Sequence, residues 1–162
     1  GTFSKIVAPG LRLGWLQGPE DLIASLARRG VMASGGGFNP FTAALVAPAL
    51  DDGSIGRYLD DTLRPLLAHR AAVMAAGLRA HFPPEVTWGE PDGGYFFWLR
   101  FPDGTDTARW LPAAAQRRIG FRPGSMFSVS GRWAERMRLS FCFYEAEAIA
   151  PAVALLGRAI TS

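Results

Sequence analysis

The apolar residues between positions 59 and 82 constrain the fold more than any other feature, because they recur at steps of three and four residues. This spacing places them in one stripe along a long amphipathic helix, which must bury that stripe against a second layer. Pro65 interrupts the pattern and predicts a kink or a restart, and Pro83-Pro84 predicts the end of the helix. The residues of the stripe are Leu59, Leu63, Leu66, Leu67, Met74, Leu78 and Phe82.

Short strand patterns and helix patterns alternate in the rest of the chain. Such alternation indicates an α/β or α+β layered structure. The strand patterns are bounded by glycine and proline, and the helix patterns have the longer apolar period. The predicted strands are 86–89, 95–101, a short one near Phe121 and 137–143, and the predicted helices are 107–118, disturbed by Pro112, and 145–160.

Turn and cap residues divide the N-terminal third of the chain. The apolar run at 11–16 predicts a short buried strand, and the acidic turn after Pro19 opens a predicted helix at 19–29. Asn39 followed by Pro40 predicts the capped start of a second helix, because asparagine is a good N-cap and proline is tolerated at the first position. The Asp-Asp-Gly sequence at 51–53 predicts its end.

The Ser-Gly-Gly-Gly sequence at 34–37 should break the chain between these two helices. Backbone N–H groups in such a stretch can form an anion-binding nest ahead of a helix. A hinge and a contact with a second subunit are alternatives that the residues leave open.

Composition narrows the class of protein. Hydrophobic residues make up 49% of the 162 residues and charged residues 19%, so the chain should bury a core. The net charge of +3 comes from scattered arginines, which predicts no nucleic-acid contact through this segment. The longest uncharged run, 30–50, is broken by glycine and proline, which predicts no membrane span. One cysteine and two histidines predict no disulfide and no metal site, and fit a cytoplasmic protein.

The first twelve residues carry a candidate chemical site. Lys5 follows two hydroxyl residues, Thr2 and Ser4, and a Pro-Gly turn separates it from Arg12. A deprotonated lysine amine attacks carbonyl groups, and an arginine can bind an anion with paired hydrogen bonds. The group therefore fits a carbonyl-reactive lysine beside an anion cradle, although a solvated lysine in a turn is the ordinary alternative. The segment is not a Walker phosphate loop, because no glycine-rich stretch of that spacing precedes the lysine.

The sequence Thr-Phe-Ser-Lys at 2–5 with Pro-Gly-Leu-Arg-Leu-Gly at 9–14 closely resembles the lysine motif of fold-type I aminotransferases of class I and II, which use pyridoxal 5'-phosphate (PLP). It is most similar to the branch of 2-aminoadipate transaminases and MocR-type regulators. The resemblance implies that Lys5 carries PLP as a Schiff base and that Arg12 binds the cofactor phosphate. It also implies that Thr2 helps to hold this phosphate, with Ser4 as a further candidate.

Three later segments resemble the same family in the expected order. They are the Gly-Gly strand at 93–99, the Pro-Gly-Ser loop at 121–127 and the strand at 137–141. In the family this last strand supplies the arginine that binds the substrate α-carboxylate, which implies this role for Arg138. Arg136 lies two residues earlier and should share its face. Pairing of Arg138 with a core carboxylate is the structural alternative.

The resemblance also implies the domain organisation and the activity. Residues 1–57 would be the C-terminal part of the PLP-binding large domain, and 58–162 the interdomain helix and a small domain with a mostly antiparallel sheet flanked by helices. The full protein would be a homodimeric transferase that moves an amino group between an α-amino acid and a 2-oxo acid. An effector-sensing domain of a MocR-type regulator, or another PLP-dependent lyase or decarboxylase, are the alternatives. Because the chain begins at the lysine motif without a methionine, we expect a larger protein whose other cofactor-binding residues lie upstream.

Overall fold

The computed structural model describes residues 1–35 and 37–161. The chain divides into two compact units, Gly1–Arg64 and Pro65–Ser162. Each unit has an apolar core of its own. The smaller core contains Phe3, Val46 and Ile55. The larger core contains seventeen buried side chains among the described residues of the second unit.

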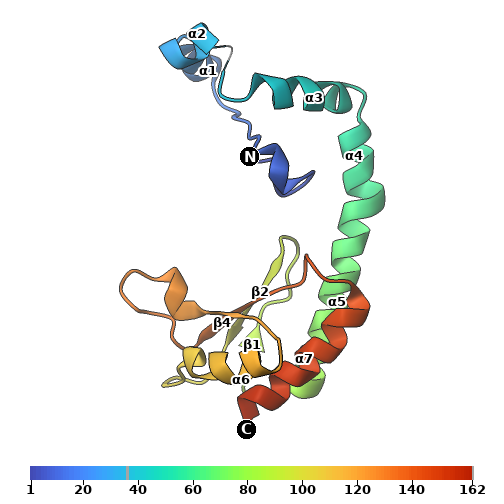
Figure 1. Ribbon diagram of the computed structural model, residues 1–162, viewed down its shortest axis with the longest axis vertical. Helices are drawn as coiled ribbons and strands as arrows, with labels where there is room; N and C mark the ends of the chain where they lie inside the picture. Colours follow the sequence, from blue (N-terminus) through green and yellow to red (C-terminus); the bar gives the residue numbers. More distant parts are fainter. Residues whose placement is uncertain (36, 162) are drawn as a thin grey trace. The chain divides into compact units, whose positions relative to one another are not determined.

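The first unit is mostly helical (Figure 1). The helix predicted after Pro19 is confirmed, and so is the helix capped by Asn39, whose Oδ1 accepts a hydrogen bond from the Thr42 backbone N–H at 3.4 Å. The elements are η1 (Pro9–Leu11), α1 (Glu20–Ala27), α2 (Gly30–Gly35), α3 (Pro40–Asp51), α4 (Ser54–Tyr58) and the π-helical turn η2 (Leu59–Leu63).

The first unit differs from the predictions in two details. The expected strand at 11–16 is absent from the described segment 1–35, where only an isolated bridge between Thr2 and Gly14 forms, and Leu16 is exposed. A strand needs paired neighbours, and this run has only the short segment 1–3 beside it. Helix α2 is not predicted, and it ends at Gly35, inside the 34–37 segment that is expected to break the chain. The hypothesis of a nest at 34–37 includes Gly36, which lies outside the described residues.

The helix predicted from the apolar stripe at 59–82 corresponds to η2 and α5 (Arg64–His81), and α4 precedes η2 without a loop. The π-helical turn ends at Leu63, two residues before Pro65. Proline has no N–H to donate to the preceding turn, so the helical hydrogen-bond pattern changes there. The predicted disturbance at Pro65 is confirmed, and the helix ends at His81, ahead of Pro83-Pro84, as predicted.

The second unit contains a four-stranded antiparallel sheet in the order β1-β2-β4-β3. All four strands lie where they are predicted, but the fourth ends at Ser140 rather than at residue 143. The predicted helix at 107–118 is split between Trp110 and Leu111, and Pro112 lies in the first turn of the second part. The elements are β1 (Thr87–Trp88), β2 (Phe96–Arg100), η3 (Thr107–Trp110), α6 (Leu111–Gln116), β3 (Arg122–Pro123), η4 (Gly124–Phe127), β4 (Arg136–Ser140) and α7 (Ala146–Thr161).

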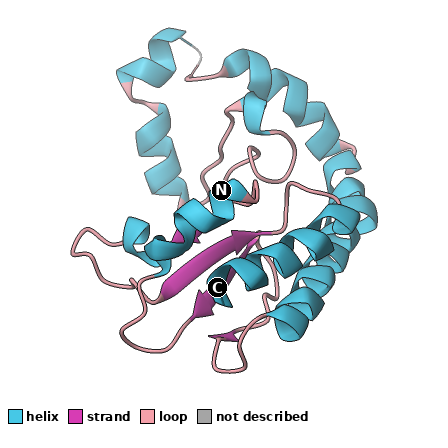
Figure 2. Ribbon diagram, turned by 60° about the horizontal axis from the view of Figure 1, so that its bottom comes forward, coloured by secondary structure: helices cyan, strands magenta, loops and turns pink. Residues whose placement is uncertain are grey.

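The two faces of this sheet differ in their side chains. One face packs against α5, α6 and α7 and forms the core, and Figure 2 shows these helices alongside the strands. Residues on β2 and β4 alternate between buried and partly exposed positions. The second face therefore carries the other side chains, and we call it the arginine face. Its residues are Phe96, Trp98 and Arg100 of β2, Arg136, Arg138 and Ser140 of β4, and Arg122 of β3.

Candidate active site

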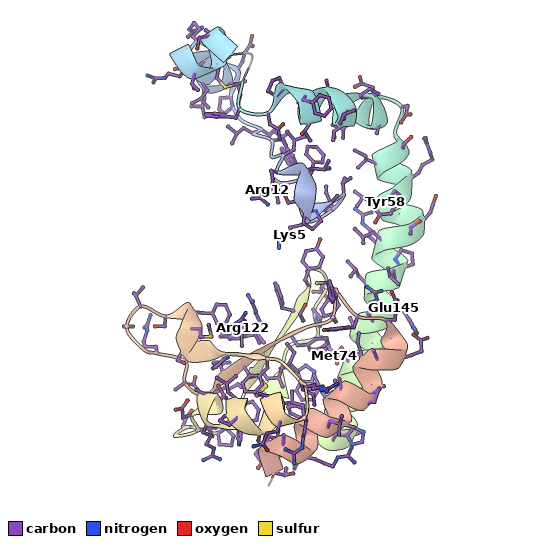
Figure 3. All side chains as sticks on the ribbon, in the orientation of Figure 1. Lys5, Arg12, Tyr58, Met74, Arg122 and Glu145 are labelled. Atoms are coloured by element: carbon purple, nitrogen blue, oxygen red, sulfur yellow. The ribbon has the colours of Figure 1, made fainter. Side chains whose placement is uncertain are left out.

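Lys5 lies on a turn whose two ends, residues 1–3 and 13–15, are joined by backbone hydrogen bonds. The Phe3 N–H donates to the Leu13 carbonyl at 2.9 Å, and the Trp15 N–H donates to the Gly1 carbonyl at 3.0 Å. The 3-10 turn η1 reverses the chain between these two segments, as the Pro-Gly sequence predicts. Lys5 and Arg12 lie on this same turn (Figure 3), and Lys5 is exposed.

Lys5 is also the single lysine of this chain. Of its 17 basic residues, the other sixteen are arginines. An arginine side chain stays protonated and does not form a covalent bond with a carbonyl group as an amine does. Lys5 is therefore the one side chain of this chain whose amine can form a covalent bond with a carbonyl group. The composition of the chain shows this independently of the lysine motif.

Arg12 has a left-handed backbone conformation, with φ 48° and ψ 38°. For a residue with a Cβ this conformation costs about 1–2 kcal/mol, so the surroundings must hold it. Asn39 does so, because its Nδ2 donates to the Leu11 carbonyl at 3.0 Å and to the Arg12 carbonyl at 3.4 Å. The sequence identifies Asn39 only as a helix cap, whereas the structure gives it a second role as a support of the Arg12 turn.

The side chain of Arg12 turns back toward the residues around Lys5. Its Nη1 donates to the Ser4 Oγ at 3.4 Å and to the Pro9 carbonyl at 3.4 Å. The structure thus brings Arg12 and Ser4 together, as neighbours of the lysine. A guanidinium has five N–H donors, so these two bonds leave donors for an external anion. An amine, a guanidinium and a hydroxyl in one turn fit a ligand with a carbonyl group and a phosphate.

Thr2 and Ser4 differ in what their hydroxyls do. The Thr2 Oγ1 donates to the Leu13 carbonyl at 3.3 Å and accepts from the Ser4 N–H at 3.1 Å. Thr2 would have to give up its bond to Leu13 in order to donate to a phosphate. The Ser4 hydroxyl accepts from Arg12 and keeps a proton that it can donate, so it is the better placed of the two.

We expect that Asn39→Asp weakens PLP binding by the full-length protein by roughly tenfold, a loss of about 1–2 kcal/mol. The carboxylate still accepts from the Thr42 N–H and caps α3, but it cannot donate to the carbonyls of Leu11 and Arg12. PLP affinity measured by equilibrium titration checks this. The matched control is Asn39→Ser, which keeps a cap acceptor and adds no charge, but lacks the longer amide N–H donor that reaches the carbonyls of Leu11 and Arg12. Wild-type affinity in both variants would show that Asn39 acts only as a cap.

Arg138 lies at the centre of β4, opposite Trp98 on β2 and Arg122 on β3. The carbon Cζ of its guanidinium lies 4.0 Å from the centre of the Phe96 ring and 4.4 Å from that of Phe127. Phe96 belongs to β2, and Phe127 belongs to η4, the turn that follows β3. In the part of the chain that the structure describes, Arg138 makes no ion pair with a carboxylate, so its charge is held by aromatic faces.

Arg136 shares the face of Arg138, as predicted. Both are half-buried, so depth does not distinguish them. Their partners do, because the Arg136 Nε donates to the Glu135 Oε1 at 3.1 Å. A shallow pocket of about 460 Å³ lies beside Arg136 and Arg100, and Arg100 is also paired, with Asp103 at 3.1 Å. Arg138 is thus the better candidate for binding an external carboxylate.

The Pro-Gly-Ser loop positions Phe127 beside β4. A Cβ atom at Gly124 would lie 2.2 Å from the Trp133 carbonyl oxygen and 2.5 Å from the Arg136 Cβ. Only glycine allows η4 to approach β4 this closely. This glycine therefore determines where the Phe127 ring meets Arg138.

The described residues contain no group of three histidine, cysteine, aspartate or glutamate side chains that could hold a metal ion. Over the same residues, no helix has both the length and the apolar character needed to cross a membrane.

A family model described as "Aminotransferase class I and II" matches residues 1–156. The chain therefore belongs to the aminotransferase class I and II family. Aromatic-amino-acid aminotransferase 1 of Thermococcus litoralis is 30% identical over 162 residues, which cover 99% of this chain and 38% of that protein. The crystal structure of Pyrococcus horikoshii kynurenine aminotransferase in complex with PMP matches with a TM-score of 0.87 and 28% identity, over 99% of this chain and 39% of that one.

Regulators also resemble this chain. The HTH-type transcriptional regulator YjiR of Escherichia coli is 28% identical over 160 residues, 98% of this chain and 33% of the regulator. The chain thus spans well under half the length of the relatives that it matches.

Proposed function

We propose that the full-length protein is a PLP-dependent aminotransferase that moves an amino group between an α-amino acid and a 2-oxo acid. The observation that carries this proposal is the turn in which Lys5, Ser4 and Arg12 come together and whose left-handed backbone Asn39 holds. Membership of the aminotransferase class I and II family supports it. The Pyrococcus relative was solved in complex with PMP, which supports a cofactor of this kind.

In this proposal Lys5 has two tasks. Its Nζ holds the cofactor covalently, and after release it accepts the proton from the substrate Cα as a general base. Arg12 binds the cofactor phosphate with a planar pair of donors, and Ser4 adds a hydroxyl donor, with Thr2 as the weaker candidate. PLP, when bound, supplies an electron sink for the bond that breaks at Cα.

Arg138 binds the α-carboxylate of the amino acid in this proposal. A guanidinium pairs with a carboxylate through two parallel hydrogen bonds, which fixes the orientation of the substrate as well as its position. The rings of Phe96 and Phe127 restrict the guanidinium before substrate arrives. Arg138 therefore contributes to orientation at Cα, while Lys5 and Arg12 hold the cofactor.

We also propose that residues 1–57 belong to the PLP-binding large domain, and that 58–162 form the interdomain helix and the small domain. The compact units divide between Arg64 and Pro65, inside this proposed interdomain helix. A cytoplasmic homodimer is the proposed form of the full-length protein. The family supports this organisation.

A second candidate is an effector-sensing domain within a transcriptional regulator, which the similarity to YjiR favours. Incubating the full-length protein with PLP, amino acids and 2-oxo acids separates the two candidates. An aminotransferase forms the new amino acid over many turnovers, which chromatography detects. A sensor binds PLP or an amino acid without turnover, and its DNA binding changes when the ligand is added.

We expect that Arg12→Lys weakens PLP binding by roughly tenfold to a hundredfold, because lysine keeps the charge but loses the paired geometry, about 1.5–3 kcal/mol. Equilibrium dialysis of PLP with the full-length protein checks this. Arg28→Lys is the matched control, an exposed arginine at the end of α1. Equal PLP affinity in the Arg12 variant and the wild type would place the phosphate elsewhere.

A further inference from the structure

Two arginines lie directly opposite each other on the arginine face. Arg122 on β3 pairs in register with Arg138 on β4. Side chains opposite each other in an antiparallel pair have Cβ atoms about 4.5–5.5 Å apart, and like charges at such positions destabilise the sheet. Figure 3 shows Arg122 on the side of the sheet away from α6. The pair is therefore an unfavourable arrangement for the fold alone.

Carboxylates do not relieve this arrangement. On the same face, Arg100 pairs with Asp103 and Arg136 pairs with Glu135, each at 3.1 Å. Among residues 1–35 and 37–161, neither Arg122 nor Arg138 forms an ion pair with a carboxylate. Positive charge thus remains concentrated at the β3–β4 edge, where an external anion would stabilise it.

The two arginines differ in how firmly they are held. Arg138 is half-buried against the rings of Phe96 and Phe127, so its N–H groups project from a restricted guanidinium. Arg122 is exposed on the short edge strand β3. A fixed arginine suits the α-carboxylate that every amino acid carries. An adjacent, exposed arginine can reach a second acidic group on the same molecule.

We propose that Arg122 binds the side-chain carboxylate of the substrate, and that the preferred substrates are amino acids with an acidic side chain. This inference rests on the proposed function and on the proposed role of Arg138. It makes Arg122 a specificity-determining residue, which the motif Phe-Arg-Pro-Gly-Ser at 121–125 does not indicate by itself. One carboxylate on each of the two guanidinium groups balances the charge of the pair.

Glutamate and glutamine test this proposal, because they have the same size and differ in the side-chain charge. We measure kcat/KM for both in the full-length wild type, in Arg122→Gln and in the matched control Arg100→Gln, whose arginine shares the face but has its own partner. We expect wild type to prefer glutamate. Arg122→Gln should lower kcat/KM for glutamate by roughly tenfold to a hundredfold and leave glutamine nearly unchanged. Arg100→Gln should keep the wild-type preference.

Binding of glutarate and of its monoamide, measured by calorimetry on the same proteins, gives a readout that needs no turnover. We expect Arg122→Gln to weaken glutarate binding and to leave the monoamide unchanged. If the protein transaminates and Arg122→Gln does not change the ratio of kcat/KM for glutamate to kcat/KM for glutamine, this inference is wrong and the proposed function stands. No turnover of any amino acid, with glutarate binding that still depends on Arg122, would overturn the proposed function and support the anion site.

Discussion

Replacing Lys5 with alanine is expected to abolish covalent attachment of PLP to this chain and to abolish transamination by the full-length protein. Alanine has no amine, and Lys5 is the single lysine among the 17 basic residues of the chain. Borohydride reduction of the PLP-loaded protein followed by peptide mapping checks this. We expect the peptide that contains Lys5 to carry the label in the wild type. The corresponding peptide of the variant should carry none.

Lys5→Arg is the matched control for the charge. Arginine keeps the positive charge beside Ser4 and Arg12 but cannot replace the amine as a nucleophile. We expect it to lose covalent attachment as completely as Lys5→Ala. If borohydride reduction of the wild type fixes PLP on a lysine that precedes residue 1 and leaves Lys5 unlabelled, Lys5 is not the anchor.

Arg138→Ala is expected to lower kcat/KM by about 100- to 1000-fold, a loss of ~3–4 kcal/mol, while PLP affinity stays at the wild-type value. The paired hydrogen bonds to the α-carboxylate are lost, and with them the orientation of the substrate at Cα. Steady-state kinetics with the best amino donor measure the first effect, and a PLP titration measures the second. A fall in both quantities would indicate a general loss of structure in β4 rather than loss of the carboxylate partner.

Arg136→Ala is the control for this assignment, because Arg136 shares the strand and the face but is paired with Glu135. We expect it to change kcat/KM by about fivefold or less, because an ion pair that is partly open to solvent contributes about 1 kcal/mol or less. If Arg136→Ala is the crippling change, the carboxylate is bound two residues earlier on the strand. If neither variant loses activity, β4 does not bind the α-carboxylate.

Local features of the sequence were sufficient for most of the elements. Asn39-Pro40 predicts the start of α3, because a side-chain acceptor and a missing N–H both act within one turn. Pro83-Pro84 predicts the end of α5 for the same local reason. The strands of the second unit are predicted because glycine and proline bound short apolar runs. The lysine motif likewise depends on residues that are close in sequence.

Predictions that depend on distant partners were less accurate. The run at 11–16 has the composition of a strand, but the described segment around it supplies only one bridge, between Thr2 and Gly14. A strand exists only where neighbours complete its hydrogen bonds, and composition does not show whether they are present. Similarly, the end of β4 at Ser140 is determined by where the pairing with β2 stops, since Phe96 pairs with Ser140.

The sequence by itself determined the family motif, the single lysine and the order of helices and strands, because each depends on residues within a few positions of one another. Tertiary structure decided which distant groups meet. The donation from Asn39 to the carbonyls of Leu11 and Arg12 spans 27 to 28 residues, and only strand register places Arg122 opposite Arg138. A shift of one residue in that register would turn Arg122 to the other face, because strand side chains alternate with a period of two.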